Sequence, residues 1–208
     1  MKKVVLIACV SKKVNKKAKA KDLFISPLFI NSLAYAYSLK PDKIYILSAL
    51  HHLLDLDKEI EPYNVTLSKL PKEKRKQGLK ILTSREKKEW GKKVIEMLSK
   101  QADLKSDLFI ILAGEEYIKP IRNYLTYIDE KLKGKCYGDR VSYLKSQLQW
   151  ELMSQNYLDY LTSYMGVAII AVKSPMSDSL LGITEETCRL ARIKLRKIEH
   201  NRMECLNN

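Results

Sequence analysis

Three short apolar runs in the first half of the chain have the length and the residue types of buried β-strands. They are Lys3 to Cys9, Ile44 to Ala49 and Asp107 to Ala113. Each run is continuous instead of alternating with polar residues, which is typical of strands that are covered on both faces. We therefore predict three strands of a sheet that is buried on both sides.

Amphipathic segments follow these runs and predict helices. One begins at Pro27, with Ser26 placed as its N-cap, and ends near Lys40. Single apolar stripes predict two more helices, over Thr83 to Ser99 and over Glu115 to Ile128. The alternation predicts an α/β fold: a mostly parallel sheet of about four or five strands, with helices on both faces.

The remaining chain predicts a helical C-terminal part. Its expected elements are a helix over Ser142 to Tyr164, a strand-like run Val167 to Val172, and a basic helix from Thr184 to about Arg202. No internal repeat or linker rich in Gly, Pro or Ser marks a boundary. We expect one α/β domain over residues 1–208, with a core over 1–150 and a helical extension over 151–208.

Composition narrows the class of protein. The 208 residues are 46% hydrophobic and 30% charged, which is typical of a globular chain. The longest apolar runs are less than half of the ~20 residues that span a bilayer. Lys2 and Lys3 precede too short an apolar run for a signal peptide, and the four cysteines form no C-x-x-C pair. We expect a cytoplasmic protein with reduced thiols and no membrane partner.

The formal net charge of +14 is concentrated in three segments. Residues 2–21 hold eight lysines and no acid, and residues 69–93 hold eleven Lys or Arg against three acids. The third segment is the predicted last helix, with Arg189, Arg192, Lys194, Arg196 and Lys197. Clustered cations attract phosphates, so we expect DNA, tRNA or a nucleotide-like ligand as partner; the alternative is a solvated lysine surface. The candidate nucleic-acid-binding residues are Lys12, Lys16, Lys17, Lys74, Arg75, Lys76, Arg192, Lys194 and Arg196.

Leu181 to Thr184, followed by a basic helix, has the pattern of a helix-turn-helix. Lys173 to Pro175 interrupts the segment that would form the first helix. An ordinary capped amphipathic helix explains the pattern better.

Polar and reactive residues follow the predicted strands at their carboxyl ends. Cys9, Ser11 and Lys13 follow the first strand, Ser48 and His51 end the second, and Gly114 follows the third. In open parallel sheets this edge binds ligands, because the loops converge there. We expect the three loops to share one pocket.

Within this pocket the residue types suggest roles. A histidine pKa near 6.5 makes His51 a candidate acid or base. Cys9 is most often a small core residue at such a position; facing the pocket beside Lys12 and Lys13, it would be a thiolate nucleophile. Neither a G-x-S-x-G elbow nor a phosphate-binding Gly-rich loop occurs, which disfavours a serine hydrolase or a P-loop enzyme.

A metal site is the alternative at the same segment. Its ligands would be His51, His52, Asp55, Asp57, Glu59 and Glu61. Adjacent histidines usually point apart, and the spacing matches no recognised ligand set. We therefore assign no metal ligand and no cofactor.

Three blocks of the sequence resemble an uncharacterised bacterial and phage family similar to the peroxide stress protein YaaA. They are Leu6 to Cys9 with Ser11 to Lys13, Ala20 to Phe24 with Ser26 to Phe29, and Tyr45 to Ala49 with His51 and Pro62-Tyr63. The first and third blocks also look distantly like the lysine-transferring domain of archaeosine synthase. That resemblance implies chemistry on a modified nucleobase, with matching positions at Cys9, Lys13, Ser26, Ser48 and Tyr63.

The chain departs from the family pattern at two positions. His51-His52 stands where the family usually has His-Gly, so a turn that tolerates positive φ must hold an imidazole at His52. Pro62-Tyr63-Asn64 stands where the family has Pro-Tyr-Asp, which removes a carboxylate.

Together these patterns predict an enzyme that acts on a nucleobase or nucleotide. His51 would be the acid or base, Cys9 or Lys13 the nucleophile, and Tyr63 would stack on the base or bind it by a hydrogen bond. The residues expected to position the substrate are Ser48, Ser11, Ser26 and Gly114. The alternatives are a non-catalytic nucleic-acid-binding protein in stress response or phage defence, and a small-molecule sensor or structural protein.

Overall fold

A computed structural model describes residues 1–69, 71, 73, 75 and 77–149. All of them fall within one compact unit. The predicted strand at Val167 to Val172 and the basic helix from Thr184 lie outside the described residues, and so does most of the helix expected over Ser142 to Tyr164. The single-domain assignment of the whole chain stays a prediction.

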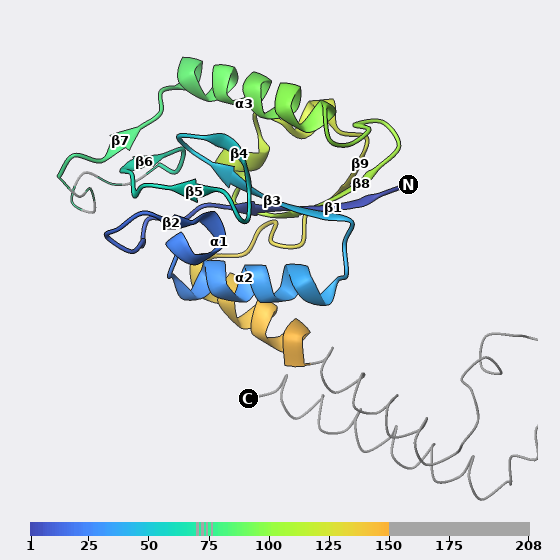
Figure 1. Cartoon of the computed structure of the whole chain (residues 1–208), viewed down its shortest axis with the longest axis horizontal. Coiled ribbons are helices and arrows are strands. Elements are labelled where there is room, and N and C mark those ends of the chain that lie inside the picture. The colour runs from blue at the N-terminus through green and yellow to red at the C-terminus, as the bar shows by residue number, and fades with distance from the viewer. Residues whose placement is uncertain (70, 72, 74, 76, 150–208) are drawn as a thin grey trace, which may run out of the picture. The chain divides into compact units, whose positions relative to one another are not determined.

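A five-stranded sheet in the order β4-β3-β1-β8-β9 forms the centre of the described part (Figure 1). Four strands run parallel, and β4 pairs antiparallel with β3 at one edge. This arrangement confirms the predicted α/β fold with a mostly parallel sheet. The strands are β1 (Lys3–Ala8), β3 (Lys43–Ser48), β4 (His52–Asp55), β8 (Leu108–Leu112) and β9 (Tyr127–Asp129).

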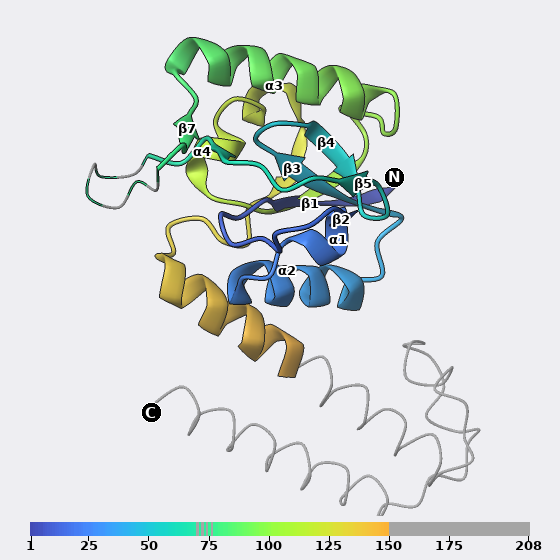
Figure 2. The ribbon, with the colours of Figure 1, turned by 60° about the vertical axis from the view of Figure 1, so that its left-hand side comes forward.

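Helices cover both faces of this sheet. The short α1 (Ala20–Leu23) and α2 (Pro27–Ser38) lie on one face, and α3 (Ser84–Ser99) lies on the other (Figures 1 and 2). Helical residues 137–149 lie on the side of α2. Burial on both faces explains why β1, β3 and β8 are continuous apolar runs.

The predicted helix starts are confirmed by their capping bonds. The Ser26 hydroxyl accepts a hydrogen bond from the Phe29 N–H at 3.2 Å. Thr83 and Glu86 form a reciprocal capping box at the start of α3. These caps satisfy backbone donors that have no partner within the helix.

Two small strand pairs lie beside the carboxyl ends of the central strands. One joins β2 (Ala18–Lys19) to β5 (Glu59–Ile60), and the other joins β6 (Val65–Thr66) to β7 (Lys80–Ile81). They fix the loops that follow β1 and β4.

The prediction of one helix over Glu115 to Ile128 is wrong. The segment forms a four-residue helix α4 (Glu115–Ile118), a short 3₁₀ helix η2 (Arg122–Tyr124) and strand β9. Pro120 has no backbone N–H and therefore cannot continue the helical hydrogen bonds. Ile128 instead pairs with Phe109 of β8, so the apolar spacing reports burial in a different structure.

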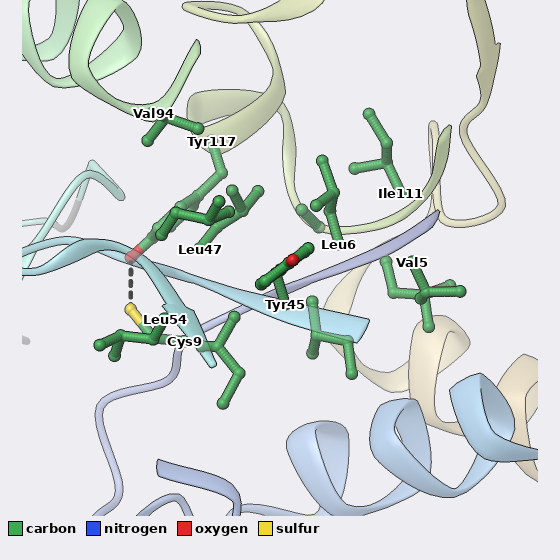
Figure 3. Close-up of a cluster of buried hydrophobic side chains, with 14 of the residues drawn as sticks. Val5, Leu6, Cys9, Tyr45, Leu47, Leu54, Val94, Ile111 and Tyr117 are labelled. Carbon is green, nitrogen blue, oxygen red and sulfur yellow. Dashed lines mark hydrogen bonds between the residues drawn. The ribbon is translucent and has the colours of Figure 1, made fainter. Parts of the chain in front are cut away.

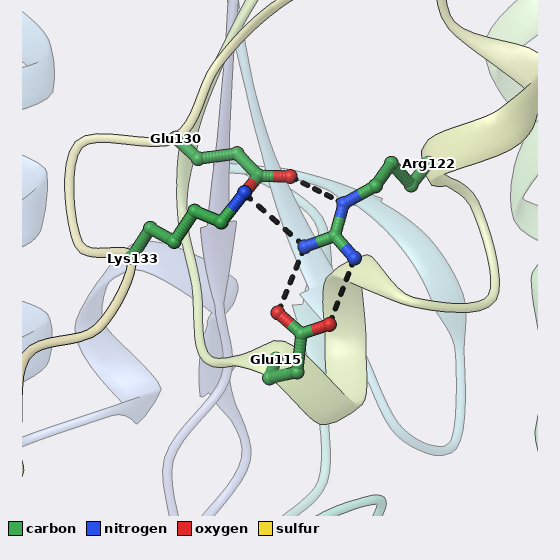
Figure 4. Close-up of polar contacts among 4 residues, drawn as sticks. All are labelled: Glu115, Arg122, Glu130 and Lys133. Atoms are coloured by element: carbon green, nitrogen blue, oxygen red, sulfur yellow. Dashed lines mark hydrogen bonds and ion pairs between the residues drawn. The ribbon is translucent and has the colours of Figure 1, made fainter.

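Arg122 connects the two ends of this irregular segment by hydrogen bonds to carboxylates (Figure 4). Its guanidinium donates two hydrogen bonds to the Glu115 carboxylate, each at 2.8 Å, and its Nε donates to Glu130 at 2.6 Å. These bonds hold the pKa of both carboxyl groups below their ordinary value. A bidentate pair of this kind fixes α4 against the start of the loop after β9.

None of the helices formed by the described residues combines the length and the apolar character needed to cross a membrane.

Candidate active site

The carboxyl ends of β1, β3 and β8 meet at one edge of the sheet, which we call the carboxyl edge. Cys9 directly follows β1, and Ser48 is the last residue of β3. Ala113 separates Gly114 from the end of β8. The Cys9 N–H donates to the Leu47 carbonyl at 3.0 Å, which fixes Cys9 beside the end of β3. The predicted convergence of these loops is therefore present.

The Cys9 sulfur lies against two tyrosine hydroxyls. The Tyr117 hydroxyl, from α4, lies 3.2 Å from Sγ (Figure 3), and the Tyr63 hydroxyl also interacts with the thiol. Cys9 is 7% exposed and Tyr117 is 4% exposed. Burial and the neighbouring Cys9 raise the pKa of both tyrosines, so their hydroxyls stay protonated near neutral pH.

Further polar groups contact these hydroxyls. The Tyr117 oxygen also interacts with Thr66 and Leu67, and either Tyr117 or Cys9 can be the donor in the contact between them. The His51 N–H donates to Ser48 Oγ at 2.9 Å, and Ser48 Oγ lies 2.7 Å from the Tyr63 hydroxyl, where again either group can donate. Cys9, Ser48, Tyr63 and Tyr117 thus form one hydrogen-bonded group, the thiol cluster.

Lys13 adds a positive charge at the rim of the thiol cluster. Its ammonium lies 4.4 Å from the centre of the Tyr63 ring and 5.4 Å from that of Phe24. An ammonium over an aromatic face is held by the ring quadrupole. Lys13 therefore covers one face of the Tyr63 ring.

His51 lies on the other side of the Tyr63 ring. The two rings meet edge to face at 5.3 Å between their centres. Burial, followed by the charge of Lys58, lowers the pKa of His51. The imidazole is therefore neutral near pH 7 and can accept a proton.

His52 occupies the left-handed region of the backbone, with φ of 66°. This confirms the expectation that the turn after β3 must hold an imidazole at positive φ. Burial, followed by the charge of Lys93, lowers the pKa of His52.

Two members of the site were missed by the sequence analysis. Tyr117, whose hydroxyl meets Cys9, had only been placed on an apolar stripe. Trp90 of α3 donates from Nε1 to the Ser48 carbonyl at 2.7 Å, and its ring meets Tyr117 edge to face. Their apolar spacing indicated burial correctly and gave no sign of these polar contacts.

The residues expected to position a substrate are less closely associated. The Ser26 hydroxyl is used as the cap of α2, and Ser11 is exposed in the loop after β1. A Cβ built on Gly114 would lie 2.9 Å from the Arg140 guanidinium, so Arg140 lies close above the end of β8. Arg140 is a cation at the carboxyl edge that the sequence analysis did not identify.

Two of the four carboxylates of the alternative metal site have other partners. Asp57 pairs with Lys19 and Lys21, and Glu59 pairs with Lys17. Over residues 1–149, without the four undescribed positions in the loop before β7, no three His, Cys, Asp or Glu side chains converge as metal ligands would.

The candidate nucleic-acid-binding residues are only partly described. Lys12, Lys16 and Lys17 are exposed in the loop after β1, and Arg75 is exposed before β7. Lys17 is paired with Glu59. The others lie outside the described residues: Lys74, Lys76, Arg192, Lys194 and Arg196.

The fold and the thiol cluster define an α/β protein with a cysteine at the carboxyl edge of a mostly parallel sheet. Comparison with family models matches residues 4–146 to a family of unknown function, DUF6884. Because this match covers more than half of the chain, the protein belongs to that family. No curated protein matches the chain.

Proposed function

We propose that the protein is an enzyme that acts on a nucleobase or nucleotide, within DNA or tRNA, and that Cys9 is its nucleophile. The observation that carries the proposal is the position of the Cys9 sulfur between two tyrosine hydroxyls at the carboxyl edge, where open parallel sheets bind ligands. The resemblance to YaaA-like proteins and to archaeosine synthase supports the nucleobase as the substrate class.

The chemistry of the cluster supports a nucleophilic role for sulfur. Hydrogen bonds that are donated to an atom stabilise negative charge on it, and the hydroxyls of Tyr63 and Tyr117, which are stronger donors than a thiol, can both donate to Sγ. The ammonium of Lys13 lies at the same rim. A thiolate is the reactive form of cysteine, so this arrangement favours attack on an electrophilic carbon.

The other residues then take defined roles. His51, neutral near pH 7, accepts or returns a proton at the substrate. The Tyr63 hydroxyl binds a polar edge of the base, since Lys13 covers one face of its ring. Cys9 is only 7% exposed, so a base has to leave its stack to approach the sulfur.

The test is a search for modified nucleosides. The full-length protein is incubated with genomic DNA and with bulk tRNA, the nucleic acids are digested, and the nucleosides are analysed by mass spectrometry. We expect one nucleoside to change mass, or to be found attached to Cys9. The change should be lost in Cys9→Ser and kept in Cys136→Ser, which removes an exposed thiol outside the cluster.

Two results would overturn the assignment. One is an equal change with Cys9→Ser, which would exclude the thiol as nucleophile. The other is an unchanged nucleoside composition with the wild-type protein on both nucleic acids, which would exclude this substrate class.

A second candidate function is nucleic-acid binding without catalysis, in stress response or phage defence. The exposed Lys12 and Lys16 beside the carboxyl edge favour it, and within the described residues they form no ion pair. Binding through phosphates weakens steeply between roughly 50 and 200 mM salt, whatever the base sequence. Lys12→Gln with Lys16→Gln should reduce binding and its salt dependence. Lys19→Gln with Lys21→Gln is the matched control, because both lysines are already paired with Asp57.

A further inference from the structure

A cavity of about 370 Å³ lies beside α3, and neither Cys9 nor Tyr63 of the thiol cluster lines it. It is bounded by one face of α3, by the turn between β3 and β4, and by the β6–β7 pair, and we call it the α3 cavity. Its charged and apolar lining includes Arg85, Glu89, Lys93, His52, Lys80 and Leu82. Its volume falls in the lower part of the range of small-molecule sites.

The α3 cavity has a surplus of positive charge. Two carboxylates line it, and each is already paired: Glu86 with Lys80 at 2.7 Å, and Glu89 with Lys92 at 3.3 Å. In the part of the chain that the structure describes, Arg85 and Lys93 form no ion pair. The two cations are therefore available to an anionic ligand.

His52 contributes an imidazole to the lining of the same cavity. The left-handed backbone at His52, with φ of 66°, is a conformation that residues other than glycine rarely adopt. Lys93 lines the same cavity, and its charge helps to lower the pKa of His52. Guanidinium, ammonium and imidazole groups around one cavity are a set that binds phosphate.

The other walls are apolar. They include Ala49, Leu50 and Val65, together with part of Trp90. A flat apolar surface of this kind suits a heterocycle, and the oxygens of Glu86 and Glu89 can accept hydrogen bonds from hydroxyl or amino groups.

We propose that the α3 cavity binds a nucleoside monophosphate, with the phosphate on Arg85, Lys93 and His52 and the base on the apolar walls. The site is distinct from the thiol cluster, because neither Cys9 nor Tyr63 lines the cavity. Trp90 borders the cavity, and its ring contacts Tyr117 of the thiol cluster. The binding of this ligand does not depend on the proposed reaction.

Tryptophan fluorescence reports binding directly. In a Trp150→Phe background, Trp90 is the single indole of the chain, which has two tryptophans. The full-length protein is titrated with adenosine 5′-monophosphate, with adenosine, and with inorganic phosphate. We expect saturable quenching by the monophosphate, with affinity at least about tenfold higher than for adenosine or phosphate alone, since each lacks half of the contacts.

Variants locate the site. Lys93→Gln and Arg85→Gln should each weaken binding of the monophosphate about tenfold or more. Lys88→Gln, at an exposed position of the same helix outside the cavity lining, should change it by less than about twofold. Cys9→Ser should bind the monophosphate like the wild-type protein, which separates this site from the thiol cluster. Far-ultraviolet circular dichroism verifies that each variant is folded.

Three outcomes would overturn the proposal. The monophosphate fails to saturate the signal at millimolar concentration, adenosine binds equally well, or Lys88→Gln weakens binding as much as Lys93→Gln. The last result would assign the attraction to the overall charge of the helix surface.

Discussion

The Tyr117 hydroxyl lies 3.2 Å from the Cys9 sulfur, although 108 positions separate the two residues in the chain. Cys9 directly follows the first strand, β1, and Tyr117 lies on the short helix α4 that follows β8. Because β1 and β8 pair in parallel, the segments that follow them emerge side by side. The sheet thus brings a thiol and a phenol together in a nearly buried position.

Removal of the Tyr117 hydroxyl should slow the reaction of Cys9 with a neutral alkylating agent. One donated hydrogen bond contributes about 1 kcal/mol, so Tyr117→Phe should lower the alkylation rate at Cys9 about fivefold. Peptide mass spectrometry measures the rate at Cys9 and, in the same sample, at the exposed Cys136. Tyr124→Phe is the control, because Tyr124 is exposed. An equal or faster reaction in Tyr117→Phe would contradict the donor role.

Ser48 should make a measurable contribution to stability. Its side chain is fully buried and bonds both the Tyr63 hydroxyl and the His51 N–H. Ser48→Ala leaves the His51 N–H without this acceptor and removes one of the two polar contacts of the Tyr63 hydroxyl, so it should lower the free energy of unfolding by about 2 kcal/mol. Urea denaturation measures the change. Ser99→Ala, at an exposed serine of α3, should cost less than about 0.5 kcal/mol; similar losses in the two variants would refute the account.

Replacement of His52 by glycine should stabilise the fold. A left-handed conformation costs a residue other than glycine roughly 1–2 kcal/mol. Glycine avoids this cost, but it loses more backbone entropy on folding, which cancels about half of the stabilisation. We expect His52→Gly to raise the free energy of unfolding by about 0.5–1 kcal/mol, as measured by urea denaturation.

Two variants calibrate this result. Lys40→Gly should give a similar gain, because Lys40 also has positive φ, at 47°. His51→Gly should lower stability, since positive φ is not recorded at this position. A loss of stability in His52→Gly would mean that contacts of the imidazole outweigh the backbone strain.

Stability should fall as the pH is lowered through the histidine range. The pKa of His51 and of His52 lies below the ordinary value of 6.5 in the folded protein, mainly because of burial. The unfolded chain therefore binds more protons below pH 6.5, so the stabilisation is complete above that pH and is lost as the pH falls toward the folded values. The urea midpoint measured between pH 7.5 and pH 5.5 should show this decrease.

The double variant His51→Gln with His52→Gln should flatten that part of the profile. The acid-induced loss below pH 4.5 should remain, because carboxyl groups such as Glu86 have a lowered pKa, about 2, through Lys80 and Thr83. An unchanged slope between pH 7.5 and 5.5 in the double variant would assign the effect to other groups.

Much of the fold could be predicted from local features of the sequence. Strands β1, β3 and β8 are continuous apolar runs because both of their faces are buried. The starts of α2 and α3 are visible because Ser26 and Thr83 cap them through bonds to residues three positions away. Such features depend on neighbours in the chain, and the sequence analysis identified them.

In the segment from Glu115 to Ile128, local features of the sequence did not predict the secondary structure. Apolar spacing indicates which residues are buried, and Tyr117, Ile118, Ile121 and Leu125 are buried. It does not indicate the hydrogen-bonding partner of the backbone. One side of β8 pairs with β1, and Tyr127–Asp129 pair in parallel with its other side as strand β9.

The candidate site divides in the same way. By itself the sequence determined that Cys9 and Ser48 lie at the carboxyl ends of buried strands that share one edge of the sheet, because parallel strands bring these ends together. Only the tertiary structure decided that Tyr117 meets the Cys9 thiol and that Trp90 meets the Ser48 carbonyl. These contacts join residues 108 and 42 positions apart, and burial alone does not distinguish a ring that packs from one whose polar atom finds a partner.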